Sequence, residues 1–161
     1  MLFARLINLI EAHAESLTRE VLEDMATNPR TPHFRGLAPE DMEERIFRLY
    51  RDLGKWIGTQ RESNIEAEYV ELGRRRSQEG VPLSELIYAV ILCKKHLRNY
   101  IQRHGLIEPA GVIDHPDVLP VHMHGIQELN YMVGTFFDRA LYYTARGYES
   151  SSGRNPVADG R

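Results

Sequence analysis

The stretch from Leu72 to Ile101 constrains the fold of this chain more than any other. It reads LGRRRSQEGVPLSELIYAVILCKKHLRNYI. Gly80 suits the left-handed position that follows a helix, because glycine has no Cβ atom to clash. Pro82 cannot continue a helix, but its fixed φ suits the first turn of the next one. The sequence therefore predicts a helix that ends near Gly80 and another that begins near Pro82.

The helix after Pro82 is the most apolar in the chain. Its apolar side chains form one broad arc on a helical wheel, which indicates contact with neighbours on more than one side. The arc consists of Leu83, Leu86, Ile87, Val90, Ile91, Leu97 and Ile101, with Cys93 and Tyr100 at one edge. We therefore expect the central helix of an all-α domain.

Apolar side chains recur at spacings of three and four elsewhere, which predicts four more helices. With the central helix, the expected ranges are 2–25, 39–58, 59–80, 82–105 and 116–148, with room for a short sixth helix between residues 106 and 118. Residues 59–62 and 63–66 each match a capping box for the third helix. Gly134 lies outside the apolar face of the last helix, where it allows close packing. The expected fold is an all-α bundle of five to six helices.

Length and composition fit one globular domain. The chain has 161 residues, a formal net charge of −3 and a hydrophobic fraction of 42%, so its charge gives no reason to expect nucleic acid. We expect a helical domain over residues 1–149 and a disordered or linker-like tail over residues 150–161. No stretch is apolar for long enough to span a membrane. The single cysteine, Cys93, fits a reducing compartment, so we expect a cytoplasmic protein with an inert core thiol.

The histidines allow three functions beside a structural role. His122 and His124 stand two residues apart, a spacing that points them to different sides of a helix, so we expect no metal site. Haem would need a histidine that faces an apolar pocket, and His96 or His122 could supply it. His96 beside two lysines is also compatible with phosphotransfer. We favour core or surface histidines and expect no cofactor.

Lys94 is the one charged residue in the middle of the apolar arc. Its stem could pack while its ammonium group reaches solvent. Otherwise it should pair with Glu68, Glu71 or Glu128, or point into a cavity that holds the anionic head group of an apolar, fatty-acid-like ligand. The candidate pocket residues are Val90, Cys93, Lys94, His96, Leu97, Phe136 and Phe137.

Other charged residues give no catalytic signal. The arginines at positions 74–76 lie near several carboxylates, and we interpret them as a solvated helix end. No nucleophile with a base and no paired carboxylates can be recognised, so we do not expect an enzyme.

Four segments resemble the N-terminal sensor domain of the RsbT co-antagonist (RsbR-type) family. They read FARLINLIEAHAESLTREVLEDM, LYRDLGKWIG, LGRRRSQEGVPLSELIYAVILCKKHL and FFDRALYYTARGYE, and they span most of residues 3–149. The resemblance implies a globin-like fold without haem, a homodimer and a role as input module in bacterial stress-response signalling. In RsbR-type proteins a phosphorylatable STAS domain follows, whereas this chain ends soon after the helical region. We therefore expect either a signalling partner in trans or a remnant or excised input domain.

The expected function is a non-enzymatic input domain that senses a partner protein or an apolar small molecule. A haem-binding gas sensor is the alternative, and an enzyme ranks last. The last helix should span about 45 Å at 1.5 Å per residue, while a domain of this size has a radius of gyration near 15 Å. Part of that helix, or of the first, should therefore pack against a second chain.

Overall fold

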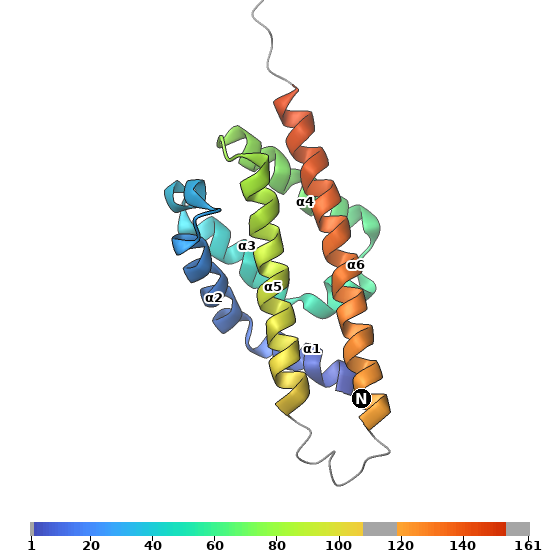
Figure 1. The fold of residues 1–161 in the computed structure, drawn as a ribbon. Helices are drawn as coiled ribbons and strands as arrows, with labels where there is room; N and C mark the ends of the chain where they lie inside the picture. Colours follow the sequence, from blue (N-terminus) through green and yellow to red (C-terminus); the bar gives the residue numbers. More distant parts are fainter. Residues whose placement is uncertain (1, 108–118, 154–161) are drawn as a thin grey trace, which may run out of the picture.

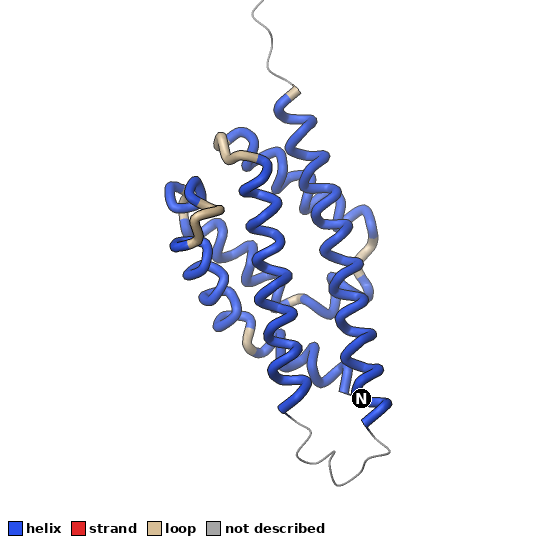
Figure 2. Tube along the Cα trace, viewed as in Figure 1, coloured by secondary structure: helices blue, strands red, loops and turns tan. Residues whose placement is uncertain are grey.

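All regular structure in the computed structural model, which describes residues 2–107 and 119–153, is helical (Figures 1 and 2). The elements are α1 (Leu2–Ala12), α2 (Ala14–Thr27), the 3-10 segment η1 (Pro32–Gly36), α3 (Pro39–Arg51), the π-helical segment η2 (Lys55–Thr59), α4 (Glu62–Gln78), α5 (Leu83–Ile107) and α6 (Leu119–Ser152). The all-α prediction is confirmed, and the described residues form six α-helices. None of these helices is both long and apolar enough to cross a membrane.

Helices α5 and α6 run antiparallel and side by side along the bundle (Figure 1). α4 packs against α6, α2 packs against α3 and α5, and α1 crosses the foot of the bundle. The core lies between these helices, and its largest fully buried side chains are Tyr50, Phe136, Phe137, Ile10, Leu17, Leu53, Ile65, Leu86, Leu92, Leu97, Ile101 and Leu129. The predicted boundary between the third and central helices is confirmed, because Gly80 has a φ of 76° and α5 begins directly after Pro82.

The single helix predicted over residues 2–25 is wrong, because the chain bends at His13 into α1 and α2. The backbone N–H of His13 is shared between the carbonyl oxygens of Leu9 and Ile10, which tightens the last turn of α1. His13 Nδ1 also hydrogen-bonds the Leu9 carbonyl at 2.8 Å. α1 therefore lies across the foot of the bundle while α2 rises beside α3 (Figure 1).

The second helix is also shorter than predicted, because α3 ends at Arg51 and not at residue 58. In a continuous helix the N–H of Gly54 would bond to the carbonyl of Tyr50. It instead donates to Glu11 Oε1 at 2.9 Å, so a carboxylate from α1 takes the place of the helical acceptor. The chain continues through η2.

Neither capping box predicted for the third helix forms, since α4 begins at Glu62 without a side-chain cap. Glu62 instead accepts a hydrogen bond from the hydroxyl of Tyr143 on α6 at 2.7 Å. A long-range contact therefore takes the carboxylate that the local motif would have used.

Helices α4 and α6 meet at two glycines. A Cβ atom added to Gly73 would overlap the carbonyl oxygen of Thr144, and one added to Gly147 would overlap that of Val70. The two backbones are therefore in direct contact. The close packing suggested at Gly134 is not found, because no described atom beyond its own helical turn lies within 4 Å of a Cβ placed there.

The remaining helix ends shift by a few residues. α5 continues to Ile107, past the predicted end at residues 103–105, and α6 begins at Leu119. α6 runs to Ser152, so the first three residues of the expected tail are helical. The short sixth helix expected between residues 106 and 118 and the tail residues 154–161 fall outside the described residues.

Candidate functional site: a core cavity and an open groove

A cavity of about 60 Å³ lies in the core among η1 and α2 to α6. Its wall is almost wholly apolar, and two arginines are the exceptions. The lining residues are Met25, Phe34, Met42, Arg45, Ile46, Leu49, Tyr69, Leu72, Arg76, Leu86, Ala89, Val90, Cys93 and Phe137. A space of this size holds on the order of five water-sized atoms.

The cavity brings together three of the residues predicted to line a pocket, namely Val90, Cys93 and Phe137. Leu97 and Phe136 are buried in the core but do not line this cavity. The two charged candidates, Lys94 and His96, lie on other surfaces of α5. The structure therefore divides the predicted set among four places: the cavity, the rest of the core, a groove and the side of α5 that faces α2.

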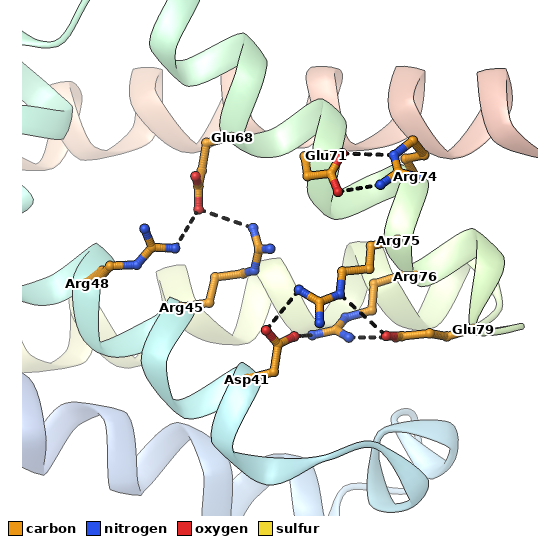
Figure 3. Close-up of polar contacts among 9 residues, drawn as sticks. All are labelled: Asp41, Arg45, Arg48, Glu68, Glu71, Arg74, Arg75, Arg76 and Glu79. Atoms are coloured by element: carbon orange, nitrogen blue, oxygen red, sulfur yellow. Dashed lines mark hydrogen bonds and ion pairs between the residues drawn. The ribbon is translucent and has the colours of Figure 1, made fainter.

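Arg76 is buried at the cavity wall, with 3% of its side chain exposed. It donates to Asp41 Oδ2 at 3.2 Å and to Glu79 Oε2 at 2.6 Å (Figure 3). Its guanidinium also stacks over the ring of Phe34, 5.9 Å from the ring centre. The expectation of a solvated helix end is therefore wrong for this arginine, which joins α4 to α3.

Arg45 and Arg48 of α3 converge on one carboxylate of α4. Each donates to Glu68 Oε1 at 3.1 Å (Figure 3). Arg45 lines the cavity and Arg48 does not. The Nε groups of Arg45, Arg48 and Arg76 are buried and have no hydrogen-bond partner. Sequence reasoning missed this arrangement, because the pairs join residues 20 or more positions apart.

Cys93 and Tyr50 close another part of the core. The hydroxyl of Tyr50 donates to the carbonyl oxygen of Cys93 at 2.8 Å. Burial raises the pKa of the Cys93 thiol to about 12, so the thiol is protonated near neutral pH. A protonated buried thiol is a poor nucleophile, in agreement with the predicted inert core cysteine.

His96 faces α2 and does not line the cavity. Its Nε2 lies 2.7 Å from Asp24 Oδ2, and its Nδ1 lies 3.6 Å from Glu20 Oε2. Burial acts to raise the pKa of Asp24, but hydrogen bonds from His96 and Asn28 outweigh it and lower this pKa overall.

The second haem candidate, His122, is buried near the end of α5. Its Nε2 lies 2.6 Å from the carbonyl oxygen of Gly105. Within residues 2–107 and 119–153, no three histidine, cysteine or carboxylate side chains group as a metal site would need.

Lys94 lies in a groove of about 790 Å³ between α5 and α6. The groove combines cationic and apolar side chains. They are Ile91, Lys94, Lys95, Arg98, Asn99, Gln102, Leu119, His122, Met123, Ile126, Gln127, Asn130 and Leu141. Ile91, predicted in the core arc, is 40% exposed here.

The ion pairs predicted between Lys94 and a carboxylate of α4 do not form. Glu68 accepts from Arg45 and Arg48, and Glu71 pairs with Arg74 (Figure 3). Lys94 has no ion pair with any residue that the structure describes. Its half-buried side chain lines the groove, about 100° around α5 from Cys93.

α6 exposes several large apolar side chains, of which Leu119 and Met123 also line the groove. They are Leu119, Val121, Met123, Tyr131 and Tyr142, and the two tyrosines are 75% and 60% exposed. Residues 123, 131 and 142 fall within about 100° of one another on a helix of 3.6 residues per turn. We call residues 123, 131 and 142 the α6 apolar face.

Comparison with known proteins agrees with the resemblance drawn from the sequence. The model of the RsbT co-antagonist protein rsbRD N-terminal domain matches residues 11–151, which is most of the chain and covers α2 to α5 and all but the last residue of α6. No match was found among curated proteins or among solved structures. The chain therefore belongs to the RsbT co-antagonist rsbRD N-terminal domain family.

Proposed function

We propose that this chain is a non-enzymatic, cytoplasmic input domain of a bacterial stress-signalling system and that it works as a homodimer. Membership of the RsbT co-antagonist family supports a signalling role. In this proposal the domain has a globin-like arrangement and passes its signal to a partner protein in trans. The signal enters as a partner contact or as an apolar small molecule in the cavity lined by Val90, Cys93 and Phe137.

The α6 apolar face is the observation that carries the dimer proposal. Tyrosine and methionine are enriched at protein interfaces. Tyr131 and Tyr142 are largely exposed in the single chain. A second copy that packs along this face would remove both rings from water.

The length of α6 supports a second copy as the occupant. Its 34 residues span about 51 Å, whereas a domain of this size has a radius of gyration near 15 Å. The C-terminal end of α6 projects beyond the other helices (Figure 1). A helix of this length offers a second chain a continuous surface along one side.

Haem binding is the rival proposal, and the histidines give it little support. His96 is hydrogen-bonded to Asp24, and His122 to the Gly105 carbonyl. Neither lines the core cavity. A haem ligand needs a free ring nitrogen that faces an apolar pocket. A Soret band with stoichiometric iron in the purified protein would favour the rival.

Light scattering at micromolar concentration tests the dimer. We expect a dimer for the unchanged protein and a helical monomer for Tyr131→Glu, because the carboxylate would be desolvated in the interface. Ser16→Glu on the exposed side of α2 is the matched control and should remain dimeric. A monomeric unchanged protein, or a dimeric Tyr131→Glu variant, would contradict the proposal.

A further inference from the structure

We propose that the groove between α5 and α6 binds an acidic amphipathic helix of the signalling partner. The inference rests on the proposed function, because it assigns a site to the partner that acts in trans and names the chemistry of that partner. In the complex, the carboxylates of the partner helix face α5 and its apolar side faces α6. No residue lines both the groove and the core cavity, so the two sites are separate.

The α5 wall of the groove is cationic. Three of its six lining residues are Lys94, Lys95 and Arg98, and none of the residues that line the groove is a carboxylate. Lys94 and Arg98 stand four positions apart, where like charges on a helix repel each other. Within residues 2–107 and 119–153, none of the three cations has an ion pair. A partner with carboxylates would relieve the repulsion.

Carboxylates of the described neighbouring helices do not line the groove. On α2, Glu20 and Asp24 pair with His96, which projects at least about 100° around α5 from each of the three cations. Lys95 interacts with Asp24 at a distance too long for an ion pair. On α6, the exposed Asp138 lies outside the lining. The groove therefore presents its cations to a carboxylate from another molecule.

The α6 wall is mainly apolar, since four of its seven lining residues are apolar. Leu119, Met123 and Ile126 follow one another at spacings of four and three, so they form one stripe along the groove. Leu119 is 44% exposed and Met123 is 49% exposed. Removing apolar surface from water is favourable. A partner that fits this groove therefore needs an apolar side as well as an acidic one.

The dimensions of the groove suit a helix of about three turns. From Ile91 to Gln102 the α5 wall extends about 17 Å at 1.5 Å per residue. Carboxylates at positions i and i+4 of a partner helix lie about 6 Å apart along its axis, as Lys94 and Arg98 do on α5. Amphipathic helices that lie in grooves are a recurrent mode of peptide recognition.

A second copy of this chain is a poorer fit to the groove. A two-fold contact of the groove with itself would bring the same cations together, where they repel each other. Nucleic acid would match the cations but not the apolar stripe. We therefore assign the groove to a protein partner and the α6 apolar face to the second copy. Met123 lies at the border of the two surfaces.

A fluorescein-labelled helical peptide of about four turns, with glutamates on one side and leucines on the other, is the probe. We expect fluorescence anisotropy to show saturable binding of one peptide per chain, which weakens as salt screens the charges. The same peptide with glutamine for glutamate should bind at least about tenfold more weakly. Absence of binding up to about 1 mM would overturn the proposal. Equal binding of the glutamine peptide, or of a DNA oligonucleotide or phosphatidylglycerol vesicles, would also overturn it.

Two exposed arginines of α5 give a matched pair of variants. Arg98→Glu and Arg103→Glu change the net charge equally, but only Arg98 lines the groove. We expect Arg98→Glu to weaken binding of the glutamate peptide at least about tenfold and Arg103→Glu to leave it within about threefold. Far-UV circular dichroism checks that both variants are folded. Equal loss in both would show a general effect of net charge and overturn the site.

Two exposed apolar residues at the start of α6 test the other wall. Leu119 lines the groove, whereas Val121 does not and is 71% exposed. We expect Leu119→Ala to weaken peptide binding about fivefold or more, because less apolar surface is buried, and Val121→Ala to have no measurable effect. Unchanged binding in Leu119→Ala would overturn the role of the apolar wall.

The Tyr131→Glu variant keeps these outcomes separate from those of the dimer test. A dimer that binds no peptide removes only the partner site, and an unchanged protein that binds the peptide as a monomer removes only the proposed dimer. Binding by Tyr131→Glu but not by the unchanged protein would mean that the second copy covers the groove. That result would overturn the acidic helix as its occupant.

Discussion

Helix α6 meets its two long neighbours in opposite ways. Against α4 the backbones touch at Gly73 and Gly147, where a Cβ atom would overlap a carbonyl oxygen. Against α5 the same helix leaves a groove of about 790 Å³ lined partly by Lys94. The α4 contact fixes a helix that supplies one wall of the core cavity, including Arg76. The α5 side has room for another molecule without any change in the core.

A methyl group added where α4 and α6 touch should lower the stability of the protein more than any other change considered. In Gly147→Ala the new Cβ atom would overlap the carbonyl oxygen of Val70, and both helix backbones would have to move. We expect the free energy of unfolding to fall by about 3 kcal/mol or more, measured by urea denaturation. A loss below about 1 kcal/mol would mean that α4 and α6 are not held in direct contact.

Removing the buried cation from the α4 side should have the next largest effect. Arg76→Met keeps the length of the side chain but removes the buried one of the two arginines that Asp41 and Glu79 share, so both carboxylates keep only the more exposed Arg75. Breaking a buried pair costs about 3–5 kcal/mol, and we expect about 2–3 kcal/mol here because both carboxylates are partly exposed. Thermal unfolding at constant pH measures the loss. A variant as stable as the unchanged protein would show that the network does not hold α4 to α3.

Replacing Lys94, a cation that lines the groove, with methionine should change the stability little. Lys94→Met also keeps the stem and removes a charge, but no carboxylate in the described part of the chain loses a partner. We expect the free energy of unfolding to stay within about 0.5 kcal/mol. Denaturation of this variant alongside Arg76→Met makes the comparison direct. A loss of about 1 kcal/mol or more would indicate that Lys94 has a partner, and a loss that depends on protein concentration would assign that partner to a second chain.

The sequence predicted the helices well because helix formation leaves a local and periodic pattern. Gly80 and Pro82 act within one turn of their own positions, and both behave as predicted. The bend at His13 left no trace in that pattern. Ile10 and Ala14 face the core on either side of the bend, so the apolar stripe continues through it.

The site could not be read in the same way, because contacts between distant helices create it. The burial of Arg76 depends on Asp41, which lies 35 positions earlier on α3. The apolar arc of α5 includes Val90 and Cys93, which line the cavity. It also included Ile91 and Lys94, which line the groove, because a wheel gives the direction of a side chain but not what lies opposite.

The one expected gain in stability comes from Gly134, the glycine on the open side of α6. No described atom beyond its own helical turn would meet a Cβ atom there, so Gly134→Ala adds only helix propensity. We expect the free energy of unfolding to rise by up to about 1 kcal/mol. The measurement is best made in the Tyr131→Glu background, because self-association would otherwise add a concentration-dependent contribution.

The comparison between backgrounds then tests what covers this surface. A loss of stability from Gly134→Ala in the monomeric background would show that another part of the same chain packs against Gly134, so that this surface is not open. A gain in that background together with a loss in the dimer would place Gly134 where a second helix approaches closely. In that case α6 would use glycine on two sides, at Gly147 for α4 of its own chain and at Gly134 for the partner. If Gly134→Ala raises the free energy of unfolding equally in both backgrounds, the second copy does not approach Gly134. Its contacts on this side of α6 would then be limited to the groove and the two tyrosines.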